Sequence, residues 1–191
     1  HENTAITMAE GYASTSGRLG IAVVGRGPAT ANGMHAAVYA NRTGSPVLII
    51  YGDAPVPGGH INTLGPDYKE FNSTMVLSAA GIQVFRATSP RGARTALADA
   101  AATAQLGNVA ALLLPTSVQL EKFDINDDAE EPPVIPDPPQ CEKATPQTIS
   151  TTAELLNKSR RPLIVAGVGA HRAGANQALQ SLADRIGALL I

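Results

Sequence analysis

The chain has 191 residues, of which 44% are hydrophobic and 16% charged, and its formal net charge is −2. Domains run to roughly 100–200 residues, so this length predicts one core and part of a second. The 14 Lys and Arg residues form no basic stripe, and no apolar run approaches the roughly 18 residues of a membrane span, which argues against nucleic-acid and membrane partners. The single cysteine, Cys141, excludes an internal disulfide and a multi-cysteine metal site, and it favours a reducing cytoplasm.

Apolar runs of strand type alternate with helical patterns over the first part of the chain. The predicted helices cover 3–16, the stretch from Pro28 to Tyr39, 69–80 and 90–106, and the predicted strands cover 20–24, 46–51, 82–86 and 109–114. Strands that are apolar on both sides and separated by helices are typical of a parallel sheet with helices on both faces. We therefore predict an α/β fold, in which ligands bind beyond the carboxyl ends of the strands.

A proline-rich and acidic segment follows, with five prolines and seven acidic residues between Glu121 and Gln140. Proline disfavours both helix and central strand, so we predict an interdomain linker at 121–141. After the linker, the patterns predict the start of a second, Rossmann-like α/β domain at 142–191. Its expected elements are a helix at 146–159, a strand at 162–166, a glycine turn at 167–169 and a helix at 173–186.

Five short motifs follow one another in a fixed order across residues 1–52. They are His1-Glu2, Met-Ala-Glu-Gly-Tyr-Ala at 8–13, Gly27-Pro28, Asn32, and the proline-led strand at 46–51 with Gly52. In this order and spacing the chain resembles the thiamine-diphosphate-dependent enzymes of the acetolactate synthase and pyruvate decarboxylase superfamily, and the resemblance continues more loosely to Val118. It implies that 1–120 form most of the pyrimidine-binding domain and that 142–191 open the central domain.

The resemblance gives Glu2 the catalytic role of hydrogen-bonding a ring nitrogen of the cofactor's aminopyrimidine. A proton shared with that nitrogen favours the imino tautomer, whose exocyclic nitrogen then removes the thiazolium C2 proton and creates the nucleophile. A carboxyl group suits this task because it can both hold and lend a proton. The alternative interpretation of Glu2 is an acidic residue at a helix N-terminus that interacts with the helix macrodipole.

The resemblance also implies cofactor contacts after the first strand, at Gly25, Gly27, Pro28 and Asn32. A backbone with few side chains lets a flat ring approach closely, so the glycines would form the floor under the pyrimidine. Asn32 is a ligand contact or, alternatively, a helix cap. The sequence departs from the family's Gly-Pro-Gly at Ala29, which replaces the second glycine.

Arg26 and His60 are the candidate substrate contacts. Arg26 either meets an acid group of the substrate or pairs with solvent or a neighbouring subunit. His60 lies in a glycine- and proline-rich loop at 55–65 after a strand, where it would shuttle protons. Pyruvate decarboxylases carry a His pair near this point, but the comparable residues here are Ile61 and Asn62.

The glycine turn of the second domain is the candidate nucleotide site. In some members of the superfamily the central domain holds FAD or another nucleotide, with phosphates near such a turn. The contacts here would be Gly167, Gly169 and Arg172. The same turn admits a dinucleotide-dependent oxidoreductase, but a third glycine at the usual spacing is missing. We predict no metal site, because the carboxylates at 124–131 lack the calcium-loop pattern and fit a solvated linker.

The function implied by the resemblance is decarboxylation of a 2-oxo acid with carboligation, as in acetolactate synthase. The alternatives are a 2-oxo-acid decarboxylase and a noncatalytic α/β module that binds a nucleotide or a partner. The diphosphate and its Mg2+ would be held by a further domain of a homodimer or homotetramer, so the 191 residues alone are expected to be inactive. The chain begins at His1 without Met and stops at Ile191 within a strand pattern, so we expect a fragment.

Overall fold

The computed structural model describes residues 1–56, 69–122, 134–135, 137 and 142–191. These residues divide into two compact units, His1–Pro139 and Gln140–Ile191, and each unit is described by itself. His60 and Cys141 lie outside the described residues, as do the carboxylates at 124–131.

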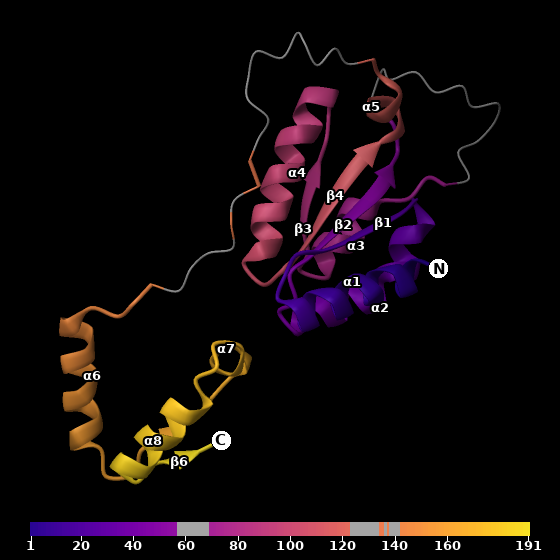
Figure 1. The fold of residues 1–191 in the computed structure, drawn as a ribbon. Coiled ribbons are helices and arrows are strands. Elements are labelled where there is room, and N and C mark those ends of the chain that lie inside the picture. The colour runs from indigo at the N-terminus through magenta and orange to yellow at the C-terminus, as the bar shows by residue number, and fades with distance from the viewer. Residues whose placement is uncertain (57–68, 123–133, 136, 138–141) are drawn as a thin grey trace. The chain divides into compact units, whose positions relative to one another are not determined.

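A four-stranded parallel sheet is the centre of the first unit, as far as the structure describes it, and its strand order is β1-β2-β4-β3 (Figure 1). The strands are β1 (Gly20–Arg26), β2 (Val47–Asp53), β3 (Gln83–Arg86) and β4 (Val109–Pro115). Central strands β2 and β4 are buried almost throughout, as expected for parallel strands covered on both faces. The predicted α/β fold with a parallel sheet is confirmed.

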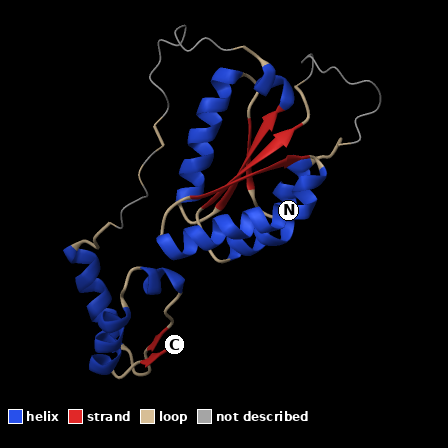
Figure 2. Ribbon diagram, turned by 45° about the vertical axis from the view of Figure 1, so that its right-hand side comes forward, coloured by secondary structure: helices blue, strands red, loops and turns tan. Residues whose placement is uncertain are grey.

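Helices cover both faces of this sheet (Figure 2). They are α1 (Glu2–Ser16), α2 (Pro28–Arg42), α3 (Ser73–Ala79), α4 (Pro90–Gln105) and the short α5 (Thr116–Leu120). Helices α1 and α2 pack with α3 over one face, where Ile49, Tyr51 and Leu113 point into the core. Helix α4 covers the opposite face, where its alanines contact Leu48 and Leu112.

Helix α3 begins four residues later than the sequence pattern predicts, so the predicted range of 69–80 is wrong at its start. The cause is a cap at Asn72, whose side-chain oxygen accepts a hydrogen bond from the Met75 backbone N–H at 2.9 Å. Asparagine at this position satisfies one of the free N–H groups of the first turn and fixes the start of the helix.

Strand β1 contains an irregularity at Gly25. Val24 is paired with Tyr51 and Arg26 with Gly52, so the register skips Gly25. Bulges of this kind redirect side chains and are common next to functional sites. Gly25 therefore lies at the carboxyl end of β1 without a partner in the β1–β2 ladder.

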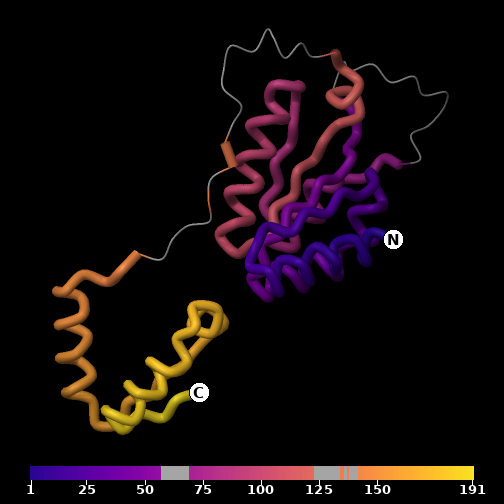
Figure 3. The backbone as a smooth tube through the Cα atoms, viewed as in Figure 1, coloured from indigo at the N-terminus to yellow at the C-terminus, as the bar shows by residue number. Residues whose placement is uncertain are grey.

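The second unit contains α6 (Pro146–Lys158), β5 (Leu163–Ile164), α7 (Val168–Arg172), α8 (Asn176–Ile186) and β6 (Leu189–Leu190), which the tube in Figure 3 traces in orange and yellow. Strands β5 and β6 pair in parallel. The predicted strand at 162–166 shortens to two residues because only Leu163 and Ile164 have ladder partners. Helix α7 occupies most of the predicted turn. Among the described residues no helix is long and apolar enough to cross a membrane.

Candidate functional site

Glu2 is the first residue of α1, and its carboxyl group reaches the carboxyl end of β1. A Cβ atom added to Gly25 would lie 3.9 Å from Glu2 Oε1. The other oxygen, Oε2, accepts a hydrogen bond from Asn32 Nδ2 at 3.4 Å. The fold thus brings together three of the residues predicted from the sequence, from α1, β1 and α2.

Two polar contacts fix α1 in this position. Asn3 Oδ1 accepts a hydrogen bond at 3.1 Å from the backbone N–H of Ala36 on α2. Further along α1, Glu10 Oε1 accepts one at 2.9 Å from Ser45 Oγ, which lies between α2 and β2. Because both bonds join α1 to distant parts of the chain, they orient the turn that carries Glu2.

A pocket of about 220 Å³ opens beside the Glu2 side chain. It is lined by His1, Glu2, Ala5, Val23, Val24 and Gly25. Ala5, Val23 and Val24 supply apolar side chains to its walls, His1 and the carboxyl group of Glu2 supply polar ones, and Gly25 has no side chain to block the approach of a flat ring. This combination fits an aromatic nitrogen heterocycle, which presents apolar faces and a ring nitrogen that a carboxyl group can hydrogen-bond.

Gly27 is required by the backbone itself. It has φ 65° and ψ −114°, a conformation that residues with side chains avoid, and a Cβ atom there would collide with the carbonyl oxygen of Lys69. Pro28 follows as the first residue of α2, where its fixed φ suits a helix start. Arg26 ends β1 opposite Gly52, and its side chain is half-buried.

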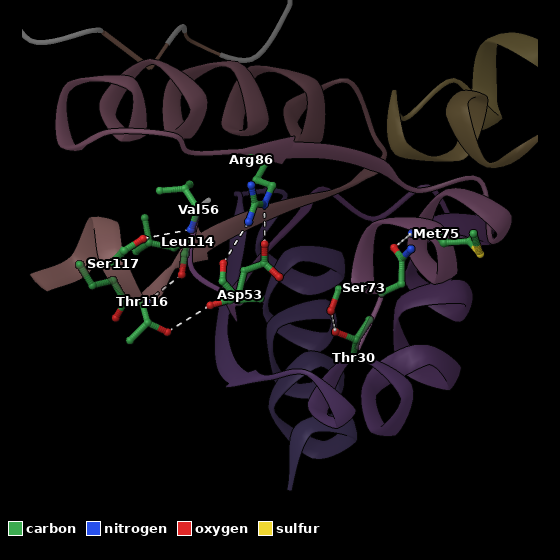
Figure 4. A network of polar contacts seen from close by, with 12 residues as sticks. Thr30, Asp53, Val56, Ser73, Met75, Arg86, Leu114, Thr116 and Ser117 are labelled. Carbon is green, nitrogen blue, oxygen red and sulfur yellow. Dashed lines mark hydrogen bonds and ion pairs between the residues drawn. The ribbon is translucent and has the colours of Figure 1, made fainter. Parts of the chain in front are cut away.

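A polar network that the sequence analysis missed joins the carboxyl ends of β2, β3 and β4 (Figure 4). Arg86 Nε donates a hydrogen bond at 2.6 Å to Oδ2 of the buried Asp53, and Arg86 Nη2 donates one at 3.0 Å to the carbonyl of Ala54. Thr116 Oγ1 donates to the Asp53 carbonyl at 3.1 Å. Asp53 and Arg86 lie 33 residues apart, so sequence spacing gave no sign of this pair.

A second buried contact joins α2 to α3. The hydroxyl groups of Thr30 and Ser73 lie 2.8 Å apart, and both residues are buried (Figure 4). This bond satisfies two groups that would otherwise be unpaired in the core.

Tyr51 on β2 is a further buried polar residue, and the sequence pattern concealed it within an apolar strand. Its side chain is fully buried, and its hydroxyl oxygen has no hydrogen-bond partner among the residues that the structure describes. Burial raises the pKa of the Tyr51 phenol, because the charged form loses its solvation. The hydroxyl therefore stays protonated and remains a hydrogen-bond donor.

At the predicted nucleotide site of the second unit, close packing does not require glycine at 167 or at 169. Gly167 caps α7 with φ −84°, and a Cβ atom on Gly167 or Gly169 would meet nothing within 4 Å. Arg172 is the last residue of α7 and is exposed. Within the described parts of the chain, no group of three or more His, Cys, Asp or Glu side chains is placed to hold a metal ion.

Two parts of the chain match family models. Residues 1–75 match the N-terminal TPP binding domain of thiamine pyrophosphate enzymes, and residues 149–191 match their central domain. Thiamine pyrophosphate is another name for thiamine diphosphate. The chain thus belongs to the superfamily of thiamine-diphosphate-dependent enzymes.

Curated relatives cover almost the whole chain. The acetolactate synthase large subunit of Corynebacterium glutamicum is 28% identical over 98% of the chain and 29% of its own length. A probable acetolactate synthase large subunit of Methanocaldococcus jannaschii is 29% identical over 96% of the chain and 31% of its own length. The glyoxylate carboligase of Escherichia coli O157:H7 is 30% identical over 96% of the chain and 30% of its own length. The chain spans about a third or less of each of these relatives.

Proposed function

We propose that this chain supplies the pyrimidine-binding part of a thiamine-diphosphate-dependent enzyme that decarboxylates a 2-oxo acid and joins the product to a second carbonyl compound. The observation that carries the proposal is the Glu2 carboxyl group, which lies beside Gly25 in a pocket that Ala5, Val23 and Val24 also line. The similarity to acetolactate synthases and to a glyoxylate carboligase supports carboligation, which makes the enzyme a transferase or lyase.

Each residue of the pocket has a distinct role in this proposal. Glu2 exchanges a proton with a ring nitrogen of the aminopyrimidine, and Asn32 holds Oε2 of that carboxyl group. Gly25 leaves room for the ring, and Gly27 with Pro28 sets the path of the chain into α2. Thiamine diphosphate supplies, when bound, the nucleophilic carbon that adds to the 2-oxo acid. Arg26 and His60 remain predicted substrate contacts.

The complete enzyme requires parts beyond these residues. We propose that 1–120 form most of the pyrimidine-binding domain, 121–141 a linker and 142–191 the start of the central domain. The family models match 1–75 within the first range and 149–191 within the last. Mg2+ and the diphosphate would bind to a separate domain of a second subunit in a cytoplasmic homodimer or homotetramer. The 191 residues alone would then be inactive. FAD or another nucleotide at Gly167, Gly169 and Arg172 remains a prediction.

The retained acid favours catalysis over a noncatalytic binding module. A module that binds only a nucleotide or a protein has no chemical need for a carboxyl group at this point of the pocket. A simple 2-oxo-acid decarboxylase stays the alternative within the family, and analysis of the products from a panel of 2-oxo acids separates it from a carboligase.

The test is a calorimetric titration with thiamine diphosphate and Mg2+ of two proteins, the 191-residue chain and the full-length protein encoded by its gene. We expect binding by the full-length protein, and loss of 2-oxo-acid turnover in its Glu2→Gln variant. Glu10→Gln is the matched control, because Glu10 lies on the same helix but contacts Ser45 outside the pocket. A full-length protein that ignores the cofactor would refute the proposal, and so would full turnover in Glu2→Gln.

A further inference from the structure

Helix α1 approaches the backbone of α2 closely at Gly33. A Cβ atom added to Gly33 would lie 2.5 Å from Ile6 Cδ1, well below the usual contact distance of about 3.5–4.0 Å between carbon atoms. Ile6 follows Glu2 by one helical turn, so both side chains lie on the same face of α1. The same Cβ atom would lie 3.8 Å from Glu2 Cβ. The absence of a side chain at residue 33 therefore lets the first turn of α1 lie against α2.

Ile6 has little room to turn away from this point. Its side chain is fully buried, and it belongs to the core cluster that also contains Ala9 and Tyr51. A β-branched side chain in a helix keeps one preferred χ1 rotamer, and protein cores leave few voids that could take a displaced methyl group. Tyr51 Oη also lies 3.7 Å from the position of the added Cβ atom. A methyl group at residue 33 would therefore move α1 and not only the tip of Ile6.

A shift of α1 would be passed on to the Glu2 carboxyl group. The first turn of α1 is also joined to α2 by the 3.1 Å hydrogen bond from Ala36 N to Asn3 Oδ1, so the two helices touch on both sides of this turn. Relief of the collision at Ile6 requires a displacement of roughly 1 Å. Groups that bind a ligand must be held to within about 0.5 Å, so this displacement is enough to misalign Glu2.

We propose that Gly33 is a positioning residue for the reaction. By leaving room for Ile6 against α2, it sets the place of the Glu2 carboxyl group beside Gly25. This inference rests on the proposed function, because Glu2 acts there on the aminopyrimidine of thiamine diphosphate. Gly33 does not line the pocket beside Glu2, so it acts through α1.

The test uses Gly33→Ala in the full-length protein. We expect the affinity for thiamine diphosphate with Mg2+ to fall about tenfold, because the bound ring loses a well-aligned hydrogen bond to Glu2. Exchange of the thiazolium C2 proton of the bound cofactor with deuterium oxide should slow by about 10- to 100-fold, because a displacement of this size misplaces the group that assists proton removal.

Ile6→Val is the compensating change. It removes only Cδ1, after which the Cβ atom added at residue 33 has no other neighbour closer than 3.7 Å. The double variant moves one methyl group from residue 6 to residue 33 and conserves the volume of the core. It should therefore restore both the affinity and the exchange rate to near their wild-type values.

Gly11→Ala is the matched control for a loss of stability. Gly11 also lies within a helix, but a Cβ atom there would meet nothing within 4 Å. This variant should raise the melting temperature without cofactor, since alanine favours a helix more than glycine does, and leave affinity and exchange unchanged. All variants are compared below their melting temperatures, so a purely structural role of Gly33 would lower only the melting temperature of Gly33→Ala.

The outcomes are distinct from those of the proposed function. If the wild-type protein does not bind the cofactor, the proposed function fails and this inference fails with it. If the wild type binds and Gly33→Ala binds and exchanges equally well, the Gly33 inference alone is overturned. A defect that Ile6→Val does not relieve also overturns it, because the collision with Ile6 would not be the cause. If Gly33→Ala does not fold, the double variant decides, since its failure to fold or to bind contradicts the inference.

Discussion

The Asn32 amide meets the Glu2 carboxylate across helices α1 and α2, with 3.4 Å between Nδ2 and Oε2. This distance is at the long end for a hydrogen bond, so the contact biases the carboxyl group and does not lock it. The shorter bond from Ala36 N to Asn3 Oδ1, at 3.1 Å, attaches the helix. The helix is therefore held firmly while its acidic side chain keeps freedom to meet a ligand.

Replacing Asn32 by Ala should weaken cofactor binding only slightly, by about two- to fivefold, because a long hydrogen bond contributes little. Stability should change by no more than about 0.5 kcal/mol, since the side chain is exposed. Calorimetry on the full-length protein measures the first quantity and urea unfolding the second. A loss of affinity as large as that of Glu2→Gln would mean that Asn32 itself contacts the ligand.

Gly27→Ala should be strongly destabilising, by about 3 kcal/mol or more, because it adds a collision with the Lys69 carbonyl to an unfavourable backbone conformation. Gly17→Ala is the matched control. Gly17 has a similar φ of 69°, but a Cβ atom there would meet nothing within 4 Å, so the expected cost is about 1–2 kcal/mol. Equal costs in urea unfolding would contradict the collision at residue 27.

The Thr30–Ser73 pair should show strong coupling in a double-mutant cycle. Thr30→Val or Ser73→Ala alone leaves the other buried hydroxyl unpaired and should cost about 1–3 kcal/mol. The double variant should cost less than the sum of the two, because no unpaired hydroxyl is left. Thr7→Val, at an exposed threonine of α1, serves as the control. Additive costs would show that the two hydroxyl groups do not depend on each other.

The raised pKa of the Tyr51 phenol predicts a loss of stability at high pH. The folded chain holds this proton more tightly than the unfolded chain, so the contribution of Tyr51 to the free energy of unfolding is complete below the ordinary tyrosine pKa, near 10. As the pH rises further, Tyr51 ionises first in the unfolded chain. The free energy of unfolding then falls by up to about 1.4 kcal/mol per pH unit. Urea unfolding from about pH 9 to about pH 11 should therefore show a steeper decline in wild type than in Tyr51→Phe. The exposed-tyrosine variant Tyr39→Phe should keep the wild-type slope.

Much of the fold follows from local pattern. Helix α4, predicted at 90–106, is found at Pro90–Gln105, and the predicted strand at 109–114 is found as Val109–Pro115. These elements agree because continuous apolar runs and alanine-rich stretches leave little local choice. The start of α3 was predicted less well, because a single side-chain cap at Asn72 decided it.

The sequence by itself determined the α/β class and, through the ordered motifs of residues 1–52, the family and the candidate acid Glu2. Only the tertiary structure decided which residues meet at the site. The contacts that depend on it are those of Asp53 with Arg86, of Thr30 with Ser73, and of Gly33 with Tyr51 and Glu2. The partners in each contact are many residues apart in the sequence. Each contact depends on the strand order or on how α1 and α2 pack over the sheet. The physical reason is that periodicity reports which face of an element is apolar, whereas hydrogen-bond partners depend on the three-dimensional approach of distant elements.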